Sequence, residues 1–453
     1  MKRVQNVIQN WYFFIVVAVV VFLAEFIGMI SIPMPIGSIM FFPLLYAMVM
    51  MLLLYLIKGF KPVGKKQEQI ADTFVILGIT VFIAKVSIAS GVALPQVIEA
   101  GPALLLQELG NLGTIFIAMP IALLLGFKRE AVGMTHSIAR EPNVGIIANK
   151  YGLDSPEGEG VIMIYVVGTL IGTIFMGILA SVLATATPLH PLALAMATGV
   201  GSGSMMAASS APLMTEFPDM ATEIQAFAAT SNVLSTADTI IVTFFIGLPL
   251  CNWLYKVLEP KLGKGRSLKG KASIENRETA VMDDPVEVPA DVDKKLSGDK
   301  VGEMLLAVII TAVIALIGNW IWLDGWTAET TATFGPSVIG ICILAGIAIA
   351  GNLLGTIIPG KIPAVIWITV IGILLAMPWN PMSVKIVEYV NAVQMLPLAT
   401  PILAYAGVTM GKNWADFKRI GWRGIVVAVC VMFGTFVGSA IIAQIILSAT
   451  GVI

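Results

Sequence analysis

The sequence is poor in charged residues. Only 12% of its 453 residues are Asp, Glu, Lys or Arg, whereas 57% are hydrophobic, and this balance lies outside the range of soluble domains. The net charge of -1 provides no excess of basic side chains for phosphate contacts, so we expect no nucleic-acid partner. The composition predicts an integral membrane protein in contact with lipid.

Cysteine and histidine are scarce, at three and two residues. Cys251, Cys342 and Cys430 lie in apolar stretches without CxxC or Cys/His spacing, which favours small core residues over a disulfide or a zinc site. The chain also lacks GxSxG, HExxH and Walker lysine motifs. We therefore predict that the protein is not an enzyme and that it holds no cofactor, except a sodium ion if sodium drives it.

Long apolar segments dominate the rest of the chain. A membrane-spanning helix needs roughly 20 apolar residues, and eleven candidate spans fit this length: 10–30, 36–57, 70–90, 102–127, 160–184, 226–256, 302–322, 336–358, 362–379, 387–410 and 422–448. The first begins after a basic start, as a signal peptide does, but its length favours a retained helix. The expected fold class is an all-α polytopic membrane protein.

The lysines and arginines set the orientation, because short cytoplasmic loops are enriched in them. Lys2 and Arg3 precede the first span, four lysines follow the second, and Lys128 and Arg129 follow the fourth. The loops at 31–35, 91–101 and 185–193 carry neither residue type. This pattern predicts a cytoplasmic N-terminus.

Residues 259–300 interrupt the hydropathy. This segment is basic at first, then acidic, and has no aromatic residue. Its early lysines predict a cytoplasmic linker, which is either a tether between two membrane halves or a regulatory segment. The chain then divides into five regions. Residues 1–69 hold the first two spans, which form a scaffold, and residues 70–184 form the first-repeat core with a hairpin at 131–150. Residues 185–258 hold the second hairpin and its following span, 259–300 are the linker, and 301–453 hold the second-repeat spans.

Two stretches have similar patterns of glycine. Gly91 and Gly101 have the same spacing as Gly411 and Gly421, and the Gly-Thr pair at 113–114 matches the one at 434–435 after one inserted residue. The charge distribution gives the two copies opposite orientations. Inverted repeats are typical of secondary transporters, because exchanging the conformations of the two halves converts an outward-open state into an inward-open one.

Two other segments are too broken to cross as regular helices. One is "KREAVGMTHSIAREPNVGIIANKYG" and the other is "HPLALAMATGVGSGSMMAASSAPLMTEFPDMATE". We expect two oppositely oriented re-entrant hairpins that meet near the midplane, where irregular backbone is tolerated only beside protein or a water-filled cavity.

Three segments resemble a known family. In order and pattern, "VFIAKVSIASGVALPQVIEAG", "GMTHSIAREPNVGIIANKYG" and "GTLIGTIFMG" resemble the sodium:glutamate symporter family and related inverted-repeat transporters. This resemblance implies an elevator-type carrier that works as a homodimer in the bacterial inner membrane. The family's Gly-Gly-His-Gly hairpin tip is here "MTHSIAREP", so the resemblance does not identify the substrate.

Asp238 lies in the sixth predicted span, where a charged group is expensive. Ser231 and Ser235 share its helix face at i, i+4 and i+7, and Asn232 is close by. Hard oxygen ligands beside a carboxylate favour a sodium ion or a coupling proton at Asp238; the alternative is that these polar groups only hold helices together.

Glu108 is a second buried acid in a predicted span. Lys85 lies at a similar depth on the neighbouring span, so the two can form a structural ion pair. The alternative is that Glu108 takes part in proton coupling.

The hairpins supply the candidate substrate ligands. In the first, Arg140 can hold a carboxylate, His136 can titrate near neutral pH, and Asn143 adds an amide, although Arg140 can equally pair with Glu141 or face water. In the second, the glycines permit an unwound backbone, and a half-helix directs its positive end at an anion. The candidates there are Ser202, Gly203, Ser204, Ser209 and Ser210; a small-residue helix-packing surface is the alternative.

The combined prediction is a secondary active transporter for a small polar solute, an organic anion or amino acid, coupled to sodium or protons. A channel or gated pore is the alternative. An intramembrane enzyme would need a set of catalytic residues that the sequence does not contain.

Overall fold

A computed structural model describes residues 2–33, 38–57, 59–136, 141–152, 155–263, 298–323, 328–358 and 364–453. Within these ranges, the side chains at 2, 38, 141–142, 145, 148–149, 236–241, 328–333, 413 and 415–419 are not part of the description. Arg140, the side chain of Asp238 and most of the predicted linker at 259–300 therefore lie outside the described residues.

Helices make up nearly all of the described chain. Those before the linker are α1 (Lys2–Gln9), α2 (Trp11–Ile27), α3 (Pro43–Leu56), α4 (Glu68–Val92), α5 (Leu94–Glu99), α6 (Gly101–Leu106), α7 (Gly113–Leu124), α8 (Glu130–Thr135), α9 (Glu141–Tyr151), α10 (Pro156–Ala186), α11 (Pro191–Thr198), α12 (Gly203–Glu216), α13 (Ala221–Val242) and α14 (Leu248–Leu262). Those after it are α15 (Gly298–Trp322), α16 (Ala328–Ile357), α17 (Ala364–Ala376), α18 (Ser383–Asn391) and α19 (Met395–Thr450). Short 3-10 helices occur at η1 (Lys65–Gln67), η2 (Gln107–Leu112) and η3 (Pro218–Met220).

One short β-hairpin departs from the all-α prediction. Strands β1 (Ile30–Pro33) and β2 (Ser38–Phe41) pair antiparallel, with Ile30 opposite Phe41. The second span was predicted to begin at residue 36, but the helix begins only at Pro43. Pro33 cannot donate a helical hydrogen bond, and the isoleucines in both strands favour extended structure.

The described helices confirm only part of the eleven predicted membrane spans. Among the described residues, six helices are long and apolar enough to cross a bilayer, and eight if each of two bent pairs is one span. These pairs are α1 with α2, bent by 59°, and α18 with α19, bent by 61°. Two predicted spans, at 36–57 and 362–379, contain the helices α3 and α17, of 14 and 13 residues. At 1.5 Å per residue such helices reach only about 20 Å, less than the roughly 30 Å hydrocarbon core. The chain is a helical, multi-pass membrane protein.

The sixth predicted span is an unbroken helical run with a change of winding. Helix α13 leads into a π-helix, η4 (Thr243–Gly247), and then into α14. π-helical turns inside α-helices often occur at functional sites. This one lies only a few residues beyond the predicted cation ligands.

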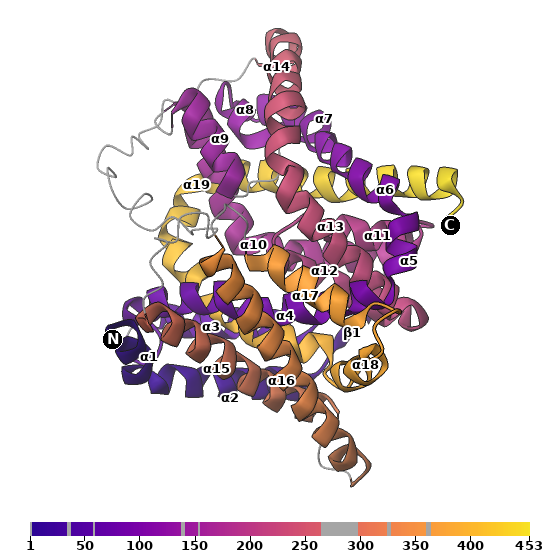
Figure 1. Cartoon of the computed structure of the whole chain (residues 1–453). Coiled ribbons are helices and arrows are strands. Elements are labelled where there is room, and N and C mark those ends of the chain that lie inside the picture. Colours follow the sequence, from indigo (N-terminus) through magenta and orange to yellow (C-terminus); the bar gives the residue numbers. More distant parts are fainter. Residues whose placement is uncertain are drawn as a thin grey trace.

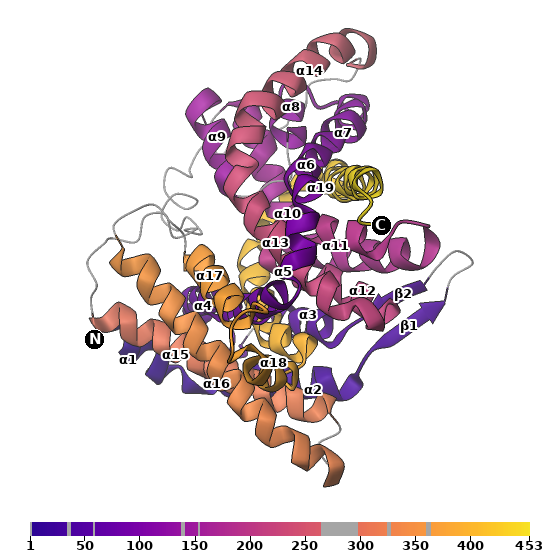
Figure 2. The same ribbon diagram turned by 45° about the vertical axis from the view of Figure 1, so that its right-hand side comes forward.

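The helices form two neighbouring groups. Helices α1–α4 and α15–α18 lie mainly on one side, and α6–α14 on the other, in both views (Figures 1 and 2). Helix α19 contributes to both groups, and it changes direction at Gly421, where φ is 72° and a side chain would be strained. Residues 301–453, predicted as one region, therefore pack in both groups.

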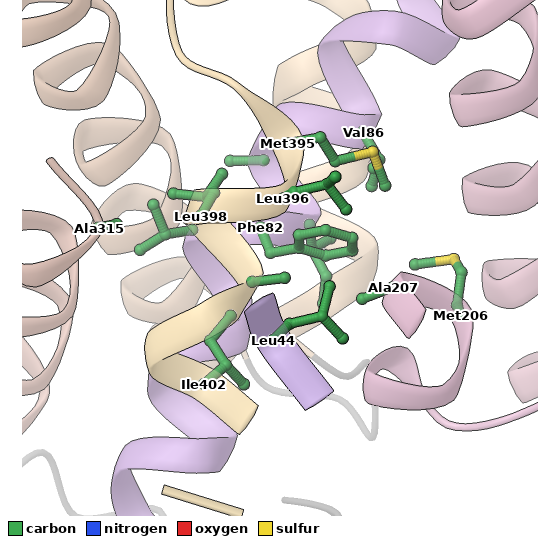
Figure 3. Close-up of a cluster of buried hydrophobic side chains, with 14 of the residues drawn as sticks. Leu44, Phe82, Val86, Met206, Ala207, Ala315, Met395, Leu396, Leu398 and Ile402 are labelled. Atoms are coloured by element: carbon green, nitrogen blue, oxygen red, sulfur yellow. The ribbon is translucent and has the colours of Figure 1, made fainter. Parts of the chain in front are cut away.

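A shared hydrophobic core joins the groups. Phe82 and Val86 of α4 lie between Met206 of α12 and the start of α19 at Leu396 (Figure 3). Burial of such side chains supplies about 1.5–3 kcal/mol each relative to exposure. The second hairpin is thus held against both α4 and α19.

Candidate functional site: two broken hairpins around η2 and α13

The second predicted hairpin is a helix, a four-residue break and a second helix. Helix α11 begins at Pro191, with His190 as its N-cap: the His190 imidazole accepts from the Leu192 N–H at 3.3 Å. Burial lowers the pKa of His190, which favours the neutral ring that can accept this bond. Helix α12 begins after Ser202, whose hydroxyl accepts from the Met205 N–H. The predicted unwound segment is confirmed at residues 199–202.

The carbonyl oxygens of the break are bound by α13. The Asn232 amide donates to Gly199 O at 2.8 Å and to Gly201 O at 2.9 Å, and the Ser231 hydroxyl donates to Met196 O at 2.7 Å. Irregular backbone inside a membrane needs such partners, because no lipid group can replace them. Asn232 and Ser231 therefore stabilise the shape of the second hairpin.

The glycines of the break permit close helix contact. A Cβ at Gly199 would lie 2.5 Å from the Ser231 hydroxyl oxygen and 2.6 Å from Ala228 O. A Cβ at Gly203 would meet the Ile79 side chain of α4 at 2.5 Å. Besides permitting the unwound backbone, Gly199 and Gly203 therefore make room for neighbouring helices.

The serines of the second hairpin fall into two classes. Ser209 and Ser210 are fully buried, and their hydroxyls donate to Met205 O and Met206 O of their own helix. Ser202 is exposed and Ser204 is half-buried, and their hydroxyl oxygens lie 3.0 Å apart at the start of α12. Of the predicted hydroxyl ligands, only Ser202 and Ser204 present their oxygen atoms at the helix break.

The polar face of α13 continues beyond the break. The Gln107 amide of η2 donates to the Ser231 hydroxyl at 2.8 Å. One turn further along α13, the Ser235 hydroxyl is buried without a hydrogen-bond partner among the described residues. Asp238 is the next residue on this face, and its side chain lies outside the description. Of the predicted cation ligands, Ser231 therefore contacts η2, Asn232 binds the break of the second hairpin, and Ser235 lies one turn further along α13.

Glu108 lies on η2 and is almost fully buried. The Asn111 amide donates to its carboxylate at 2.5 Å. The predicted pairing with Lys85 does not form: the Lys85 ammonium donates to Val390 O at 2.8 Å and to the Asn391 side chain at 3.4 Å, both on α18. Helix α18 ends at Asn391, so its last carbonyl groups are available to bind the cation.

The first predicted hairpin consists of α8 and α9, with residues 137–140 between them outside the described part. Helix α8 packs closely on α10, because a Cβ at Gly133 would lie 1.8 Å from Glu157 O. His136 follows α8 and is buried; its Nδ1 lies 3.0 Å from Gly133 O, and its Nε2 has no hydrogen-bond partner among the described residues. Asn143 is buried in α9.

Helix α13 and η2 connect the two hairpins. A Cβ at Gly247, on the π-helix η4, would lie 3.2 Å from His136 O and 3.8 Å from the Leu112 side chain. The end of α8 therefore meets η4 and the end of η2, while the break of the second hairpin meets the start of η2 through Ser231. Ser235 and Asp238 lie on α13 between these two meeting points.

One buried acid escaped the sequence analysis. Glu25, on α2, is 4% exposed and accepts a hydrogen bond from the Thr400 hydroxyl at 2.6 Å. The signal was present, since Glu25 is an acidic residue inside the apolar run "FFIVVAVVVFLAEFIGMI", where a charge needs a partner or a function.

The sequence model of one protein family matches this chain. It is described as a protein of unknown function (DUF3100) and covers residues 22–257, more than half of the chain and both hairpins. Neither a curated protein nor a solved structure matches. The chain belongs to the DUF3100 family of proteins of unknown function.

Proposed function

We propose that this protein is a secondary active transporter. It moves a small polar solute, an organic anion or amino acid, across the bacterial inner membrane by alternating access, driven by sodium or protons. In this proposal it works as a homodimer, has no enzymatic activity and needs no cofactor beyond the coupling cation. The resemblance to the sodium:glutamate symporter family and the elevator motion that it implies remain predictions.

The observation that carries the proposal is the supported break at residues 199–202. Gly199 O and Gly201 O are held by Asn232, so the main chain is unwound in one defined shape. The break leaves Ser202 exposed between two buried helical stretches. A half-helix with an exposed serine at its N-terminal end is suited to binding an anionic group, because its N–H groups and its dipole both favour negative charge.

The position of the cation ligands supports coupling. Ser231 and Asn232 hold the second hairpin, and Ser235 lies one turn beyond them with a buried hydroxyl that lacks a partner among the described residues. A cation held by Ser235 and Asp238 would therefore act on the helix that fixes the hairpin. Glu108 neighbours Gln107, which bonds to Ser231, and it supplies a second carboxylate close to this face.

The contact between α7 and α19 also supports the proposal. A Cβ at Gly113 would lie 2.9 Å from Gly434 O, and a Cβ at Gly434 would lie 2.9 Å from the Cα of Thr114. These are the residues that the sequence pairs as repeat equivalents. Reciprocal contacts of this kind are expected where inverted repeats meet around a pseudo-two-fold axis.

Uptake into proteoliposomes under an imposed sodium or proton gradient tests the proposal. The purified full-length chain would be screened with labelled amino acids and carboxylates. Saturable accumulation that requires a gradient is the expected result. Flux that neither saturates nor depends on a gradient would instead favour the channel.

The variant Asp238→Asn tests the predicted cation site in the same uptake assay. It should abolish gradient-driven accumulation while the protein remains folded. Asp219→Asn makes the same chemical change at an exposed residue of η3 and should transport as the wild type does. Wild-type accumulation by Asp238→Asn would remove Asp238 from the mechanism.

A further inference from the structure

A second polar centre lies apart from the hairpins, on the first helix of the membrane region. Glu25 of α2 is buried against α15 and α19. A Cβ added at Gly318 of α15 would lie 3.3 Å from the Glu25 Cγ, and it would also be close to Pro397 of α19 and to Val21. Its Oε1 lies 2.6 Å from the Thr400 hydroxyl, and its Oε2 has no hydrogen-bond partner among the described residues. The hairpin site described above does not involve this carboxyl.

Most of the described charged and titratable groups on the surrounding helices are engaged elsewhere. Helix α2 packs against α3, α15 and α19, and no described ion pair includes Glu25. The charged groups and their partners are Asp299 and Glu303 with Arg3, and Lys412 with Asp72. Tyr46 donates to Phe41 O, and Tyr55 donates to Glu68. The Tyr405 ring packs against Phe13 and Phe74, and its hydroxyl has no hydrogen-bond partner among the described residues. Lys300 and Glu303 are more than 20 Å along α15 from Gly318, at about 1.5 Å per residue. Lys85, on α4, donates to α18.

An ionised carboxylate is costly in these surroundings. Without a cation partner, a buried acid normally becomes neutral by binding a proton. Hard metal cations take about six or more oxygen ligands in proteins. Around Glu25 the structure offers the Thr400 hydroxyl and the Leu396 carbonyl oxygen, among apolar neighbours. The surroundings therefore suit a proton better than a metal ion.

Thr400 can accommodate both protonation states. Its hydroxyl oxygen lies 2.6 Å from Glu25 Oε1 and 3.1 Å from Leu396 O, yet it has only one hydrogen to donate. When Glu25 carries a proton on Oε1, the acid donates to Thr400 and Thr400 donates to Leu396 O. When the proton leaves, Thr400 turns and donates to the carboxylate. The exchange breaks one O–H bond of the acid and passes the proton to water.

Thr400 lies close to the bend between α18 and α19. Thr400 lies in the second turn of α19, just after the 61° bend between α18 and α19. The bend is held by Asn319 of α15, which accepts from the Gln394 N–H at 2.7 Å and donates to Ala392 O at 3.2 Å. A displacement of α19 relative to α2 and α15 would separate Thr400 from Glu25 and admit water.

We propose that Glu25 is a proton-carrying residue: it binds a proton in the conformation seen here and releases it when α19 moves away from α2. This inference rests on the proposed transport function, and it identifies the proton as a coupling ion at a site distinct from Asp238. Thr400 is a positioning residue for it.

Infrared spectroscopy tests the protonation directly and needs no solute. The purified full chain in liposomes should show, at neutral pH, a carboxylic acid C=O band that disappears in Glu25→Gln. Glu99→Gln, at an exposed residue at the end of α5, is the matched control and should keep the band. The proposal is overturned if Glu25→Gln leaves the neutral-pH spectrum unchanged, or if replacing KCl by NaCl removes the band, which would indicate a sodium site.

Transport assays test the role in coupling. With the labelled amino acid or carboxylate that the wild type accumulates, Glu25→Gln should retain exchange of internal for external solute but lose at least tenfold in accumulation driven by a proton gradient. Thr400→Val should shift the pH dependence of accumulation, whereas Thr400→Ser should restore it. Wild-type proton-driven accumulation by Glu25→Gln would overturn the proposal. Absence of any gradient-driven uptake by the wild type would instead reject the transport function, while the infrared result would still stand.

Discussion

Thr114 of α7 and Thr435 of α19 face each other, and their hydroxyl groups share a hydrogen bond. The Thr114 hydroxyl also lies 3.2 Å from Val431 O. These two threonines follow Gly113 and Gly434, which bring the two main chains into close contact. Residues that the sequence aligns more than 300 positions apart thus meet at one helix crossing.

The crossing predicts a coupled effect of two substitutions. Thr114→Val and Thr435→Val should each destabilise the protein by roughly 0.6 kcal/mol, a typical value for hydrogen bonds between membrane helices. The double variant should lose less than the sum, because either substitution already removes the shared bond. Unfolding in mixed micelles measures all three. Strict additivity would show that the two hydroxyls do not interact.

Adding a side chain at Gly113 tests the close contact between α7 and α19. Gly113→Val places side-chain atoms against Gly434 O, where even a Cβ would lie at 2.9 Å. We expect a loss of folded protein in size-exclusion chromatography. Gly168→Val is the control, because nothing lies within 4 Å of a Cβ at Gly168 of α10. Equal yields of the two variants would contradict the close contact between α7 and α19.

Asn232 should be essential for the second hairpin. Asn232→Leu removes the donors to Gly199 O and Gly201 O, and an unsatisfied buried polar group costs about 1–3 kcal/mol. Faster amide hydrogen exchange at residues 199–205 is the expected result, measured by mass spectrometry.

Asn352→Leu provides the control for this measurement. Asn352 is another buried asparagine, but its amide donates to Ala348 O of its own helix. Its replacement should leave exchange in the second hairpin unchanged. If both variants behave alike, Asn232 has no special role at the break.

The two classes of serine predict different effects on transport. Ser202→Ala with Ser204→Ala removes the hydroxyls at the helix break and should raise the KM about tenfold, since one hydrogen bond to a charged solute is worth about 1.5–3 kcal/mol. Ser209→Ala with Ser210→Ala removes hydroxyls that bond to their own helix and should leave the KM unchanged. Proteoliposome uptake measures both double variants. An unchanged KM in the first would exclude these hydroxyls from solute binding.

His190 makes the start of the second hairpin sensitive to pH. The pKa of His190 is lowered by burial, so the neutral form is favoured in the folded protein, and its contribution to stability is lost as the pH falls below the ordinary value of about 6.5. Protonated His190 cannot accept from the Leu192 N–H through Nδ1. Hydrogen exchange of α11, corrected for the intrinsic rate, should therefore increase between pH 7 and pH 5.

His190→Asn separates this effect from general acid sensitivity. Asparagine is a good N-cap and does not titrate, so the variant should keep α11 protected over the same range. The explanation fails if the variant and the wild type lose protection in parallel.

The sequence alone determined the class of the protein and the position of its breaks. Its apolar content identified a multi-pass membrane protein. The glycines and serines at 199–204 located the break between α11 and α12, because a regular helix with those residues is unfavourable. The face formed by Ser231 and Ser235 also followed from helical spacing alone. These features depend on composition and local periodicity, which the chain carries in itself.

Only the tertiary structure decided which groups meet. Lys85 bonds to α18 instead of Glu108, and Gly199 makes room for Ser231. The hydroxyls of Ser209 and Ser210 bond within their own helix, although the sequence does not distinguish them from Ser202 and Ser204. Glu25 finds Thr400 some 375 residues away. These hydrogen-bond partners depend on how helices far apart in the chain pack together. A local sequence pattern does not specify which distant residue a buried polar group will contact.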